Sequence, residues 1–233
     1  MQIPQNPLII FDCDGVLIDS EAIYLAEEFA FLQRAGVTVD RDWYIDNFMA
    51  LALPLWKQKF IGLIEEQTGK PPSEAEFDAF AVASQKRVLE EASVIDGAKD
   101  LLGQLDCPVC VASSTGAKSL PIKLKRAGLS DFFGTSVFSG DLVGNGKPAP
   151  DLFLHAARTM GFEWANCIVI EDSPNGVRAG KSAGMFTIGF LGGGHAGISA
   201  IRRLRNAGAD HVVIDHGDLQ TWLATNTRVL STS

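Results

Sequence analysis

The stretch from residue 8 to residue 21 reads LIIFDCDGVLIDSE, and it decides the fold. Its first four residues are apolar, and two aspartates, Asp12 and Asp14, follow directly. A short, wholly apolar run is typical of a strand that is buried on both faces of a sheet. Asp-Gly between apolar runs is also a hairpin signal. A hairpin needs a second strand after Gly15, however, and the sequence EAIYLAEEFAFLQRA that follows is helical in pattern. The stretch therefore predicts a buried parallel strand that ends in two carboxylates.

Short apolar runs alternate with amphipathic stretches along most of the chain. The runs that we expect to form strands are Leu8–Phe11, Val109–Ala112, Ser136–Phe138, Cys167–Ile170, Met185–Ile188 and His211–Ile214. Four stretches between them end in glycine, a common helix stop. These expected helices are Ser119–Gly128, Asp151–Gly161, Pro174–Gly184 and Ser199–Gly208. Strand–helix–strand alternation predicts an α/β fold with a parallel, doubly wound sheet.

The segment from about Glu21 to Ala92 breaks this alternation. It contains no convincing strand, and its apolar residues recur with helical spacing around Ile23–Gln33, Phe60–Ile64 and Phe77–Leu89. A helical block between the first and second strands is most simply an inserted domain. We therefore expect residues 1–17 and 93–233 to form the sheet domain and residues 18–92 to form a helical insertion.

Composition excludes several classes of function. Hydrophobic residues make up 46% of the 233 residues, which is enough for a sizeable core, and the net charge is −8. That charge repels nucleic acid, and no concentrated run of Lys and Arg offsets it. No apolar run reaches the ~20 residues of a membrane span, and no signal peptide is visible. Four cysteines suit a reducing cytoplasm, and Cys107-Pro-Val-Cys110 is interpreted as the entrance to a buried strand.

The two aspartates after the first strand have a chemical use. They stand where parallel α/β sheets bind ligands, at the carboxyl end of a strand. A carboxylate can attack phosphorus and hold the phosphoryl group as an acyl phosphate, which divides one difficult step into two. A second carboxyl group nearby can give a proton to the leaving oxygen and later accept one from water. Two such roles require environments that separate the pKa values of the two groups.

Other polar residues follow later apolar runs. Ser113 ends the second expected strand, and Glu171-Asp172 ends the fourth, where two buried acids are costly unless a cation or hydrogen-bond donors compensate them. Ser173-Pro174 is a favourable start for the next helix. Lys147 by itself is an ordinary surface lysine, but beside a bound phosphate it would balance charge.

Taken together, these motifs resemble a known family. FDCDGVLIDS at residues 11–20 is similar to the first motif of the haloacid dehalogenase superfamily of phosphohydrolases and phosphomutases. The remaining motifs of the family follow in order as VASS at 111–114, GKPAPD at 146–151 and IEDSPNG at 170–176. The resemblance covers nearly the whole chain and implies a Rossmann-like core with a helical cap inserted after the first motif.

The resemblance also assigns roles to individual residues. It implies that Asp12 is the nucleophile and a metal ligand, and that Asp14 is the general acid/base and a metal ligand through its backbone carbonyl. It implies a Mg²⁺ ion bound directly by Asp172 and through water by Glu171. The groups implied to cradle the phosphate are Ser113, Lys147 and the backbone amides near Gly15 and Ser114.

Three other readings share some of these features. Dehalogenases of the superfamily need no metal and generally replace the second aspartate, so Asp14 and the Glu171-Asp172 pair argue against that activity. Mutases of the β-phosphoglucomutase type would carry a histidine after the first motif and a basic residue in the cap. The corresponding positions, near Tyr24 and within Asn47–Trp56, contain no Lys, Arg or His, although this alternative stays open. Receiver-type signalling domains place the acceptor aspartate on a later strand and lack a helical insertion.

The sequence therefore predicts a cytoplasmic, Mg²⁺-dependent phosphatase that acts on a small phosphorylated metabolite, a sugar, polyol or sugar-acid phosphate. The residues of the lysine and acidic motifs most resemble those of phosphatases of the 6-phosphogluconate phosphatase type. No nucleic-acid or membrane partner is expected, and the sequence gives no indication of oligomeric state. A glycine-rich segment, Gly192–His195, is a possible substrate-side loop, although a simple connector is the more common use of such a segment.

Overall fold

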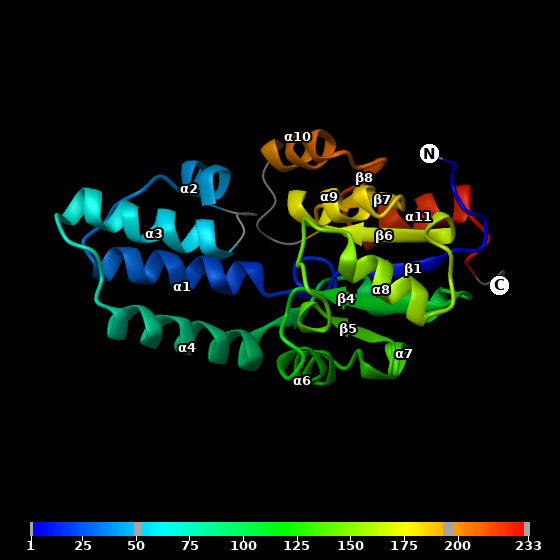
Figure 1. Ribbon diagram of the computed structural model, residues 1–233, viewed down its shortest axis with the longest axis horizontal. Coiled ribbons are helices and arrows are strands. Elements are labelled where there is room, and N and C mark those ends of the chain that lie inside the picture. The colour runs from blue at the N-terminus through cyan, green and yellow to red at the C-terminus, as the bar shows by residue number, and fades with distance from the viewer. Residues whose placement is uncertain (1, 49–52, 193–197, 231–233) are drawn as a thin grey trace. The chain divides into compact units, whose positions relative to one another are not determined.

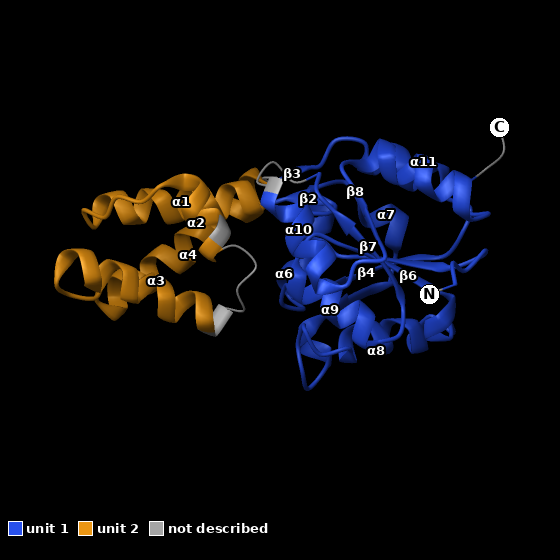
Figure 2. Cartoon of the chain, turned by 90° about the horizontal axis from the view of Figure 1, so that it is seen from above, with its two compact units in different colours: residues 1–19, 93–233 blue, residues 20–92 orange. Residues whose placement is uncertain are grey.

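The computed structural model describes residues 2–48, 53–192 and 198–230 (Figure 1). The chain divides into two compact units, as Figure 2 shows. The first unit comprises residues 1–19 and 93–233 and contains the main sheet. The second unit comprises residues 20–92 and is helical. None of the helices in the described ranges combines the length and the apolar character that a membrane span requires.

The sheet unit is built on six parallel strands. Along the sheet they are β5 (Val137–Ser139), β4 (Val109–Ser113), β1 (Leu8–Phe11), β6 (Cys167–Glu171), β7 (Phe186–Phe190) and β8 (His211–Val213). Ile9 of β1 lies opposite Val109 of β4 and Ile168 of β6. The strands that follow β1 in the sequence, β4 and β5, lie on one side of it, and the later strands β6, β7 and β8 lie on the other side. This order places the switch point of the doubly wound sheet beside β1 and β6.

Helices cover both faces of this sheet. On one face, α8 (Asp151–Thr159) and α9 (Pro174–Ser182) pack on Leu8 and Ile10 of β1 and share a core cluster with them. On the other face, Phe11 meets Phe133 of α7 (Ser130–Phe133). The helices that complete the unit are α5 (Ala98–Gln104), α6 (Ser119–Arg126), α10 (Ile198–Ala207) and α11 (His216–Asn226), with short 3₁₀ turns η1 (Gly140–Leu142) and η2 (Trp164–Asn166). All four residues of β1 are buried, as expected for a central parallel strand.

The helical unit contains α1 (Glu21–Arg34), α2 (Arg41–Phe48), α3 (Leu53–Thr68) and α4 (Glu74–Glu91). Its core is rich in aromatic rings, with Phe60 stacked on Phe80 and Phe31 packed against both. Ser73 begins α4 with a reciprocal capping box to Glu76. Two short antiparallel strands, β2 (Ile18–Asp19) and β3 (Ser93–Val94), pair where the chain leaves and re-enters the sheet unit.

The predicted fold class is confirmed. All six predicted strands form within a residue or two of the expected positions, and the four helices that were expected to end in glycine are α6, α8, α9 and α10. The sequence did not predict α2, whose eight residues carry little apolar periodicity. It also did not predict the helices α5, α7 and α11 or the two-residue strands β2 and β3. The four cysteines are free thiols, and Cys110 lies buried inside β4.

Candidate active site

Asp12 is the first residue after β1 and lies at the carboxyl end of the sheet, beside the switch point. Its backbone N–H donates to the carbonyl of Ile170 in β6 at 3.0 Å, which extends the ladder by one residue and fixes the position of Asp12. The residue is only 6% exposed. A buried carboxyl group stays ionised only where a positively charged partner or hydrogen-bond donors compensate its charge.

That partner is Lys147, which precedes α8. Its Nζ donates to Asp12 Oδ1 at 2.6 Å, to Glu171 Oε1 at 2.7 Å and to the carbonyl of Ala112 at 3.0 Å. All three N–H bonds of the ammonium are thus directed at oxygen. The same Nζ lies 4.8 Å from the centroid of the Phe153 ring. Burial lowers the pKa of Lys147, but the two carboxylates outweigh it, and the net shift of the pKa is upward. The two carboxylates therefore favour the charged form of Lys147.

Glu171, the last residue of β6, braces this arrangement. Its Oε2 accepts from the backbone N–H and the hydroxyl of Ser173, both at 3.0 Å, while Oε1 accepts from Lys147. Ser173 in turn caps α9, since its Oγ accepts from Gly176 N–H at 3.0 Å. Gly176 must be glycine here, because an added Cβ would lie 1.7 Å from Glu171 Oε1. Both oxygens of Glu171 are thus engaged by protein groups.

Asp14 is held by two residues that the sequence analysis missed. Its Oδ1 pairs with Lys123 Nζ of α6, and its Oδ2 accepts from Thr115 Oγ1 at 2.6 Å. A signal for Lys123 does exist in the sequence. It stands three residues after Leu120 and one before Leu124, which places a lysine on the buried face of α6. Thr115 gives no such signal, because its role depends only on the fold of the loop after β4.

The predicted phosphate-binding groups occupy the loops around these aspartates. Ser113 is buried at the end of β4, and its Oγ accepts from Thr115 N–H at 3.0 Å, which leaves its hydroxyl hydrogen to donate elsewhere. Ser114 is exposed. Gly15 has φ of +79°, and an added Cβ would lie 1.8 Å from Asp172 Oδ2, so its backbone is in close contact with that carboxylate. Within this turn the Gly15 N–H donates to the carbonyl of Ile18 at 2.8 Å.

The acids of the site suppress one another's ionisation. Burial raises the pKa of Asp12 well above its ordinary value; Lys147 opposes this, and Glu171, Asp172 and Asp14 add to it. Burial also raises the pKa of Asp172, followed by the charge of Glu171. A further cation would relieve this repulsion and favour the ionised forms.

The donor chemistry fits Mg²⁺, which prefers oxygen and binds through one or two carboxylates, several waters and a substrate phosphate. Among the described residues, no three His, Cys, Asp or Glu side chains form a ready-made set of metal ligands. Lysine side chains separate the carboxylates instead, since Lys147 lies between Asp12 and Glu171 and donates to both. Asp12 and Asp172 are the carboxylates best suited to a partly hydrated ion, and the absence of a side chain at Gly15 lets the Asp172 carboxylate lie against the turn after β1.

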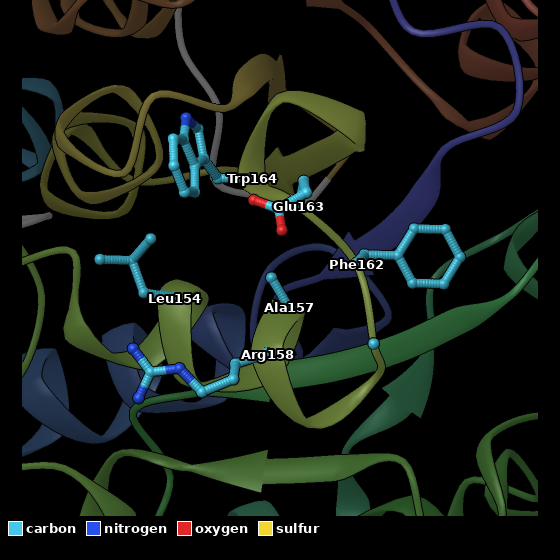
Figure 3. Close-up of a pocket in the computed structure, with 7 residues that line it drawn as sticks. Leu154, Ala157, Arg158, Phe162, Glu163 and Trp164 are labelled. Carbon is cyan, nitrogen blue, oxygen red and sulfur yellow. The ribbon is translucent and has the colours of Figure 1, made fainter.

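The structure thus gathers the eight predicted residues around the carboxyl ends of β1, β4 and β6, where Asp12, Lys147 and Glu171 are in direct contact. A surface pocket of about 500 Å³ lies elsewhere on the sheet unit (Figure 3). Its lining includes Leu154, Arg158 and Trp164, close to the amino end of β6 and so at the opposite end of the strands. Residues 193–195 of the glycine-rich segment, and residues 49–52 of the Asn47–Trp56 stretch, lie outside the described residues.

Comparison with known proteins identifies the family. The model of the haloacid dehalogenase-like hydrolases matches residues 7–184, which include every motif of the site. The chain belongs to this family. The resemblance noted in the sequence is thereby confirmed, and the protein is a hydrolase.

Individual relatives agree with this assignment. The 6-phosphogluconate phosphatase of Escherichia coli is 29% identical over 188 residues, which cover 80% of this hydrolase and 83% of the relative. A conserved haloacid dehalogenase-like protein of unknown function from Agrobacterium tumefaciens superposes with a TM-score of 0.86 at 34% identity, covering 94% and 98% of the two chains. A family hydrolase from Deinococcus radiodurans, solved with bound phosphate and sodium, superposes with a TM-score of 0.81 at 28% identity, covering 95% and 96%.

Proposed function

We propose that this hydrolase removes the phosphoryl group from a small phosphomonoester, a sugar, polyol or sugar-acid phosphate, through an aspartyl phosphate on Asp12. The observation that carries the proposal is the buried Asp12 carboxylate, which lies at the switch point of the sheet, 2.6 Å from Nζ of Lys147. Two relatives support it. The E. coli relative is named for its action on 6-phosphogluconate, and the D. radiodurans structure contains phosphate.

In the first step, an oxygen of Asp12 attacks phosphorus and the bond from phosphorus to the leaving oxygen breaks. Asp14 gives a proton to the leaving oxygen in this step. In the second step Asp14 takes a proton from a water molecule, the water oxygen attacks phosphorus, and the bond to Asp12 breaks. Lys147 remains charged throughout and offsets the negative charge that develops on the phosphoryl oxygens.

Phosphate binding falls to groups at the ends of β1 and β4. The Ser113 hydroxyl can donate to a phosphoryl oxygen because its own oxygen already accepts from Thr115. We assign the backbone amide of exposed Ser114 and the turn at Gly15 to the same cradle. Gly15 contributes a turn without a side chain, and the Asp172 carboxylate lies directly against it.

Mg²⁺ would be held by Asp12, Asp172 and the backbone carbonyl of Asp14. Glu171 would act through water, since its oxygens are bound to Lys147 and Ser173. When bound, the ion supplies positive charge that polarises the phosphoryl oxygens and favours the ionised carboxylates. We assign residues 18–92 to a cap domain whose side chains select the leaving group of the substrate.

The proposal is tested by measuring phosphate release from a panel of sugar, polyol and sugar-acid phosphates, with Mg²⁺ and with EDTA. We expect metal-dependent release from a few members of the panel. Asp12→Asn should reduce turnover to below about a thousandth, because an amide cannot form the acyl phosphate. Asp131→Asn, the same change at an exposed position of α7, is the matched control and should behave as wild type.

Two results would contradict the proposal. Substantial turnover by Asp12→Asn would remove Asp12 as the nucleophile. Absence of release from the whole panel, together with interconversion of phosphate isomers in the presence of a bisphosphate primer, would replace hydrolysis by phosphomutase activity.

A further inference from the structure

Two buried lysines serve the two aspartates of the first motif, and the proposed function explains only one of them. Lys147 pairs with Asp12, and Lys123 pairs with Asp14. Both lysine side chains are only 6% exposed. Lys147 belongs to a recognised motif of the family, whereas Lys123 comes from the middle of α6, outside the four motifs.

Lys123 lies on the apolar face of helix α6. Leu120 and Leu124 are buried on the same face, and Ala127 follows one turn after Lys123. A buried ammonium is costly unless a charged partner compensates it. The stability of the helix does not explain a lysine at an apolar position of α6. Its contact with Asp14 does.

Thr115 holds the second oxygen of Asp14, and Thr115 is itself fixed. Its hydroxyl donates to Asp14 Oδ2 at 2.6 Å. Its backbone N–H donates to Ser113 Oγ at 3.0 Å, and its carbonyl accepts from Ser139 Oγ at 2.7 Å. The Asp14 carboxyl group is thus held between a helix and a loop that is tied to the ends of β4 and β5.

We propose that Lys123 is a positioning residue that, with Thr115, sets the orientation of the Asp14 carboxyl group for proton transfer to the leaving oxygen. This inference rests on the proposed function. An ammonium can only donate, so Oδ1 remains an acceptor while Lys123 is bound. The charge of Lys123 favours negative charge on Oδ1, so a proton is better placed on Oδ2. Thr115 donates to one lone pair of Oδ2, and a proton on the other lone pair can be given to the leaving oxygen. In this role Lys123 acts through Asp14, whose carboxyl group it contacts.

The role has a kinetic signature that a purely structural lysine would not show. A sugar or polyol leaves as an alkoxide unless its oxygen receives a proton, whereas p-nitrophenolate is stable enough to leave without one. Proton transfer from a positioned side chain is worth on the order of 10²–10⁴ in rate, and misplacement by about 1 Å can remove roughly 10² of it. The loss of Lys123 should therefore be greater for alkyl phosphates than for p-nitrophenyl phosphate.

The experiment compares kcat and KM of Lys123→Met with wild type on two substrates, p-nitrophenyl phosphate and the alkyl phosphate that wild type hydrolyses fastest. We expect the loss of kcat on the alkyl phosphate to exceed the loss on p-nitrophenyl phosphate by roughly 10–100-fold, with KM little changed. Lys123→Arg should recover most of the alkyl phosphate rate. Lys125→Met, the same change at an exposed position of α6, should match wild type on both substrates.

Asp14→Asn separates this inference from the proposed function. The double variant of Lys123→Met and Asp14→Asn should be no slower on the alkyl phosphate than Asp14→Asn alone, because Lys123 acts only through Asp14. If Lys123→Met fails to fold, Thr115→Val removes the other contact of the carboxyl group and should show the same dependence on the leaving group.

Equal losses on both substrates, or additive losses in the double variant, would overturn the inference while Asp14→Asn still discriminates between the substrates. Loss of that discrimination in Asp14→Asn itself would overturn the assigned role of Asp14 and the inference with it. Absence of hydrolysis by wild type would overturn the proposed function.

Discussion

Glu28 is a carboxyl group buried inside the helical unit, and its ionisation should control how the stability of that unit depends on pH. It is 9% exposed, and its Oε2 accepts from the hydroxyl of fully buried Tyr44 at 2.9 Å. The Tyr44 ring stacks on Phe48 and meets Phe29 edge-on, so the surroundings are largely aromatic. Burial raises the pKa of Glu28 to about 8; the bond from Tyr44 opposes this, and nearby Glu21 adds to it.

The sign of the effect follows from proton linkage. The folded unit holds the Glu28 proton more tightly than the unfolded chain does, so the stabilisation is complete below the unfolded pKa and is lost as pH rises towards 8. Between pH 5 and pH 8 the free energy of unfolding of the helical unit should fall by about 3 kcal/mol from this group alone. Glu28→Gln keeps an acceptor for the Tyr44 hydroxyl but cannot ionise, so it should abolish this fall.

Amide hydrogen exchange, detected by mass spectrometry from pH 5 to pH 8, measures the opening free energy of each segment of the helical unit. After correction for the intrinsic pH dependence of exchange, the opening free energy of peptides from α1 and α2 should decline with pH in wild type and stay level in Glu28→Gln. Peptides from α8, in the other unit, are the internal control and should agree between the two proteins. The same decline in both proteins would refute the assignment of a buried, protonated Glu28.

Three further outcomes follow from the sheet unit. Asp14→Asn should cost on the order of 10²–10⁴ in kcat while Mg²⁺ still binds, because the backbone carbonyl remains; a wild-type rate would remove Asp14 from the reaction. Gly15→Ala places a Cβ 1.8 Å from Asp172 Oδ2 at φ of +79°, so it should lose both activity and stability. The control is Gly161→Ala, at φ of +78° with open space around it, which should lose only about 1–2 kcal/mol of stability because alanine is strained in the left-handed region. If the two variants lose equal stability in urea unfolding and equal turnover, the close contact of Gly15 with Asp172 is contradicted. Burial lowers the pKa of His216 to about 4, so the stability contributed by neutral His216 is complete above the unfolded pKa and declines as pH falls below it. By pH 5, wild type should lose about 2 kcal/mol of stability relative to His216→Phe. Urea midpoints of the two proteins that change in parallel with pH would contradict this loss.

The fold was predictable because its signals are local. Each central strand is a short apolar run that is buried on both faces, and the expected helices end at glycines such as Gly128 and Gly184, whose φ values are positive. Helix α2 was missed because its eight residues, RDWYIDNF, have a weak amphipathic pattern. Its burial depends on the aromatic cluster of Tyr44 and Phe48, which forms only in the folded unit.

The candidate site was predictable only where a motif lies within a few consecutive residues. Asp12 and Asp14 are visible because they end an apolar run, and the Glu171-Asp172 pair for the same reason. The contact between Asp14 and Lys123 joins residues 109 positions apart, and no local pattern states which buried carboxylate a lysine on an apolar helix face will meet. Tertiary structure alone supplies that pairing.

The arrangement of charge explains why so polar a cluster persists inside the sheet unit. Replacing a buried ion pair with apolar residues is often neutral or stabilising, so stability alone does not require Lys147 and Lys123. Each lysine instead meets one aspartate of the first motif, and the two environments differ. Asp12 shares its lysine with Glu171, whereas Asp14 shares its carboxyl group between Lys123 and the hydroxyl of Thr115. A nucleophile must stay ionised and fixed, while a proton carrier needs an oxygen with a lone pair that can hold a proton and give it to the leaving oxygen. Of these two aspartates, Asp14 has a hydroxyl partner and Asp12 has a lysine that it shares with Glu171, and this difference supports the separate roles proposed for them.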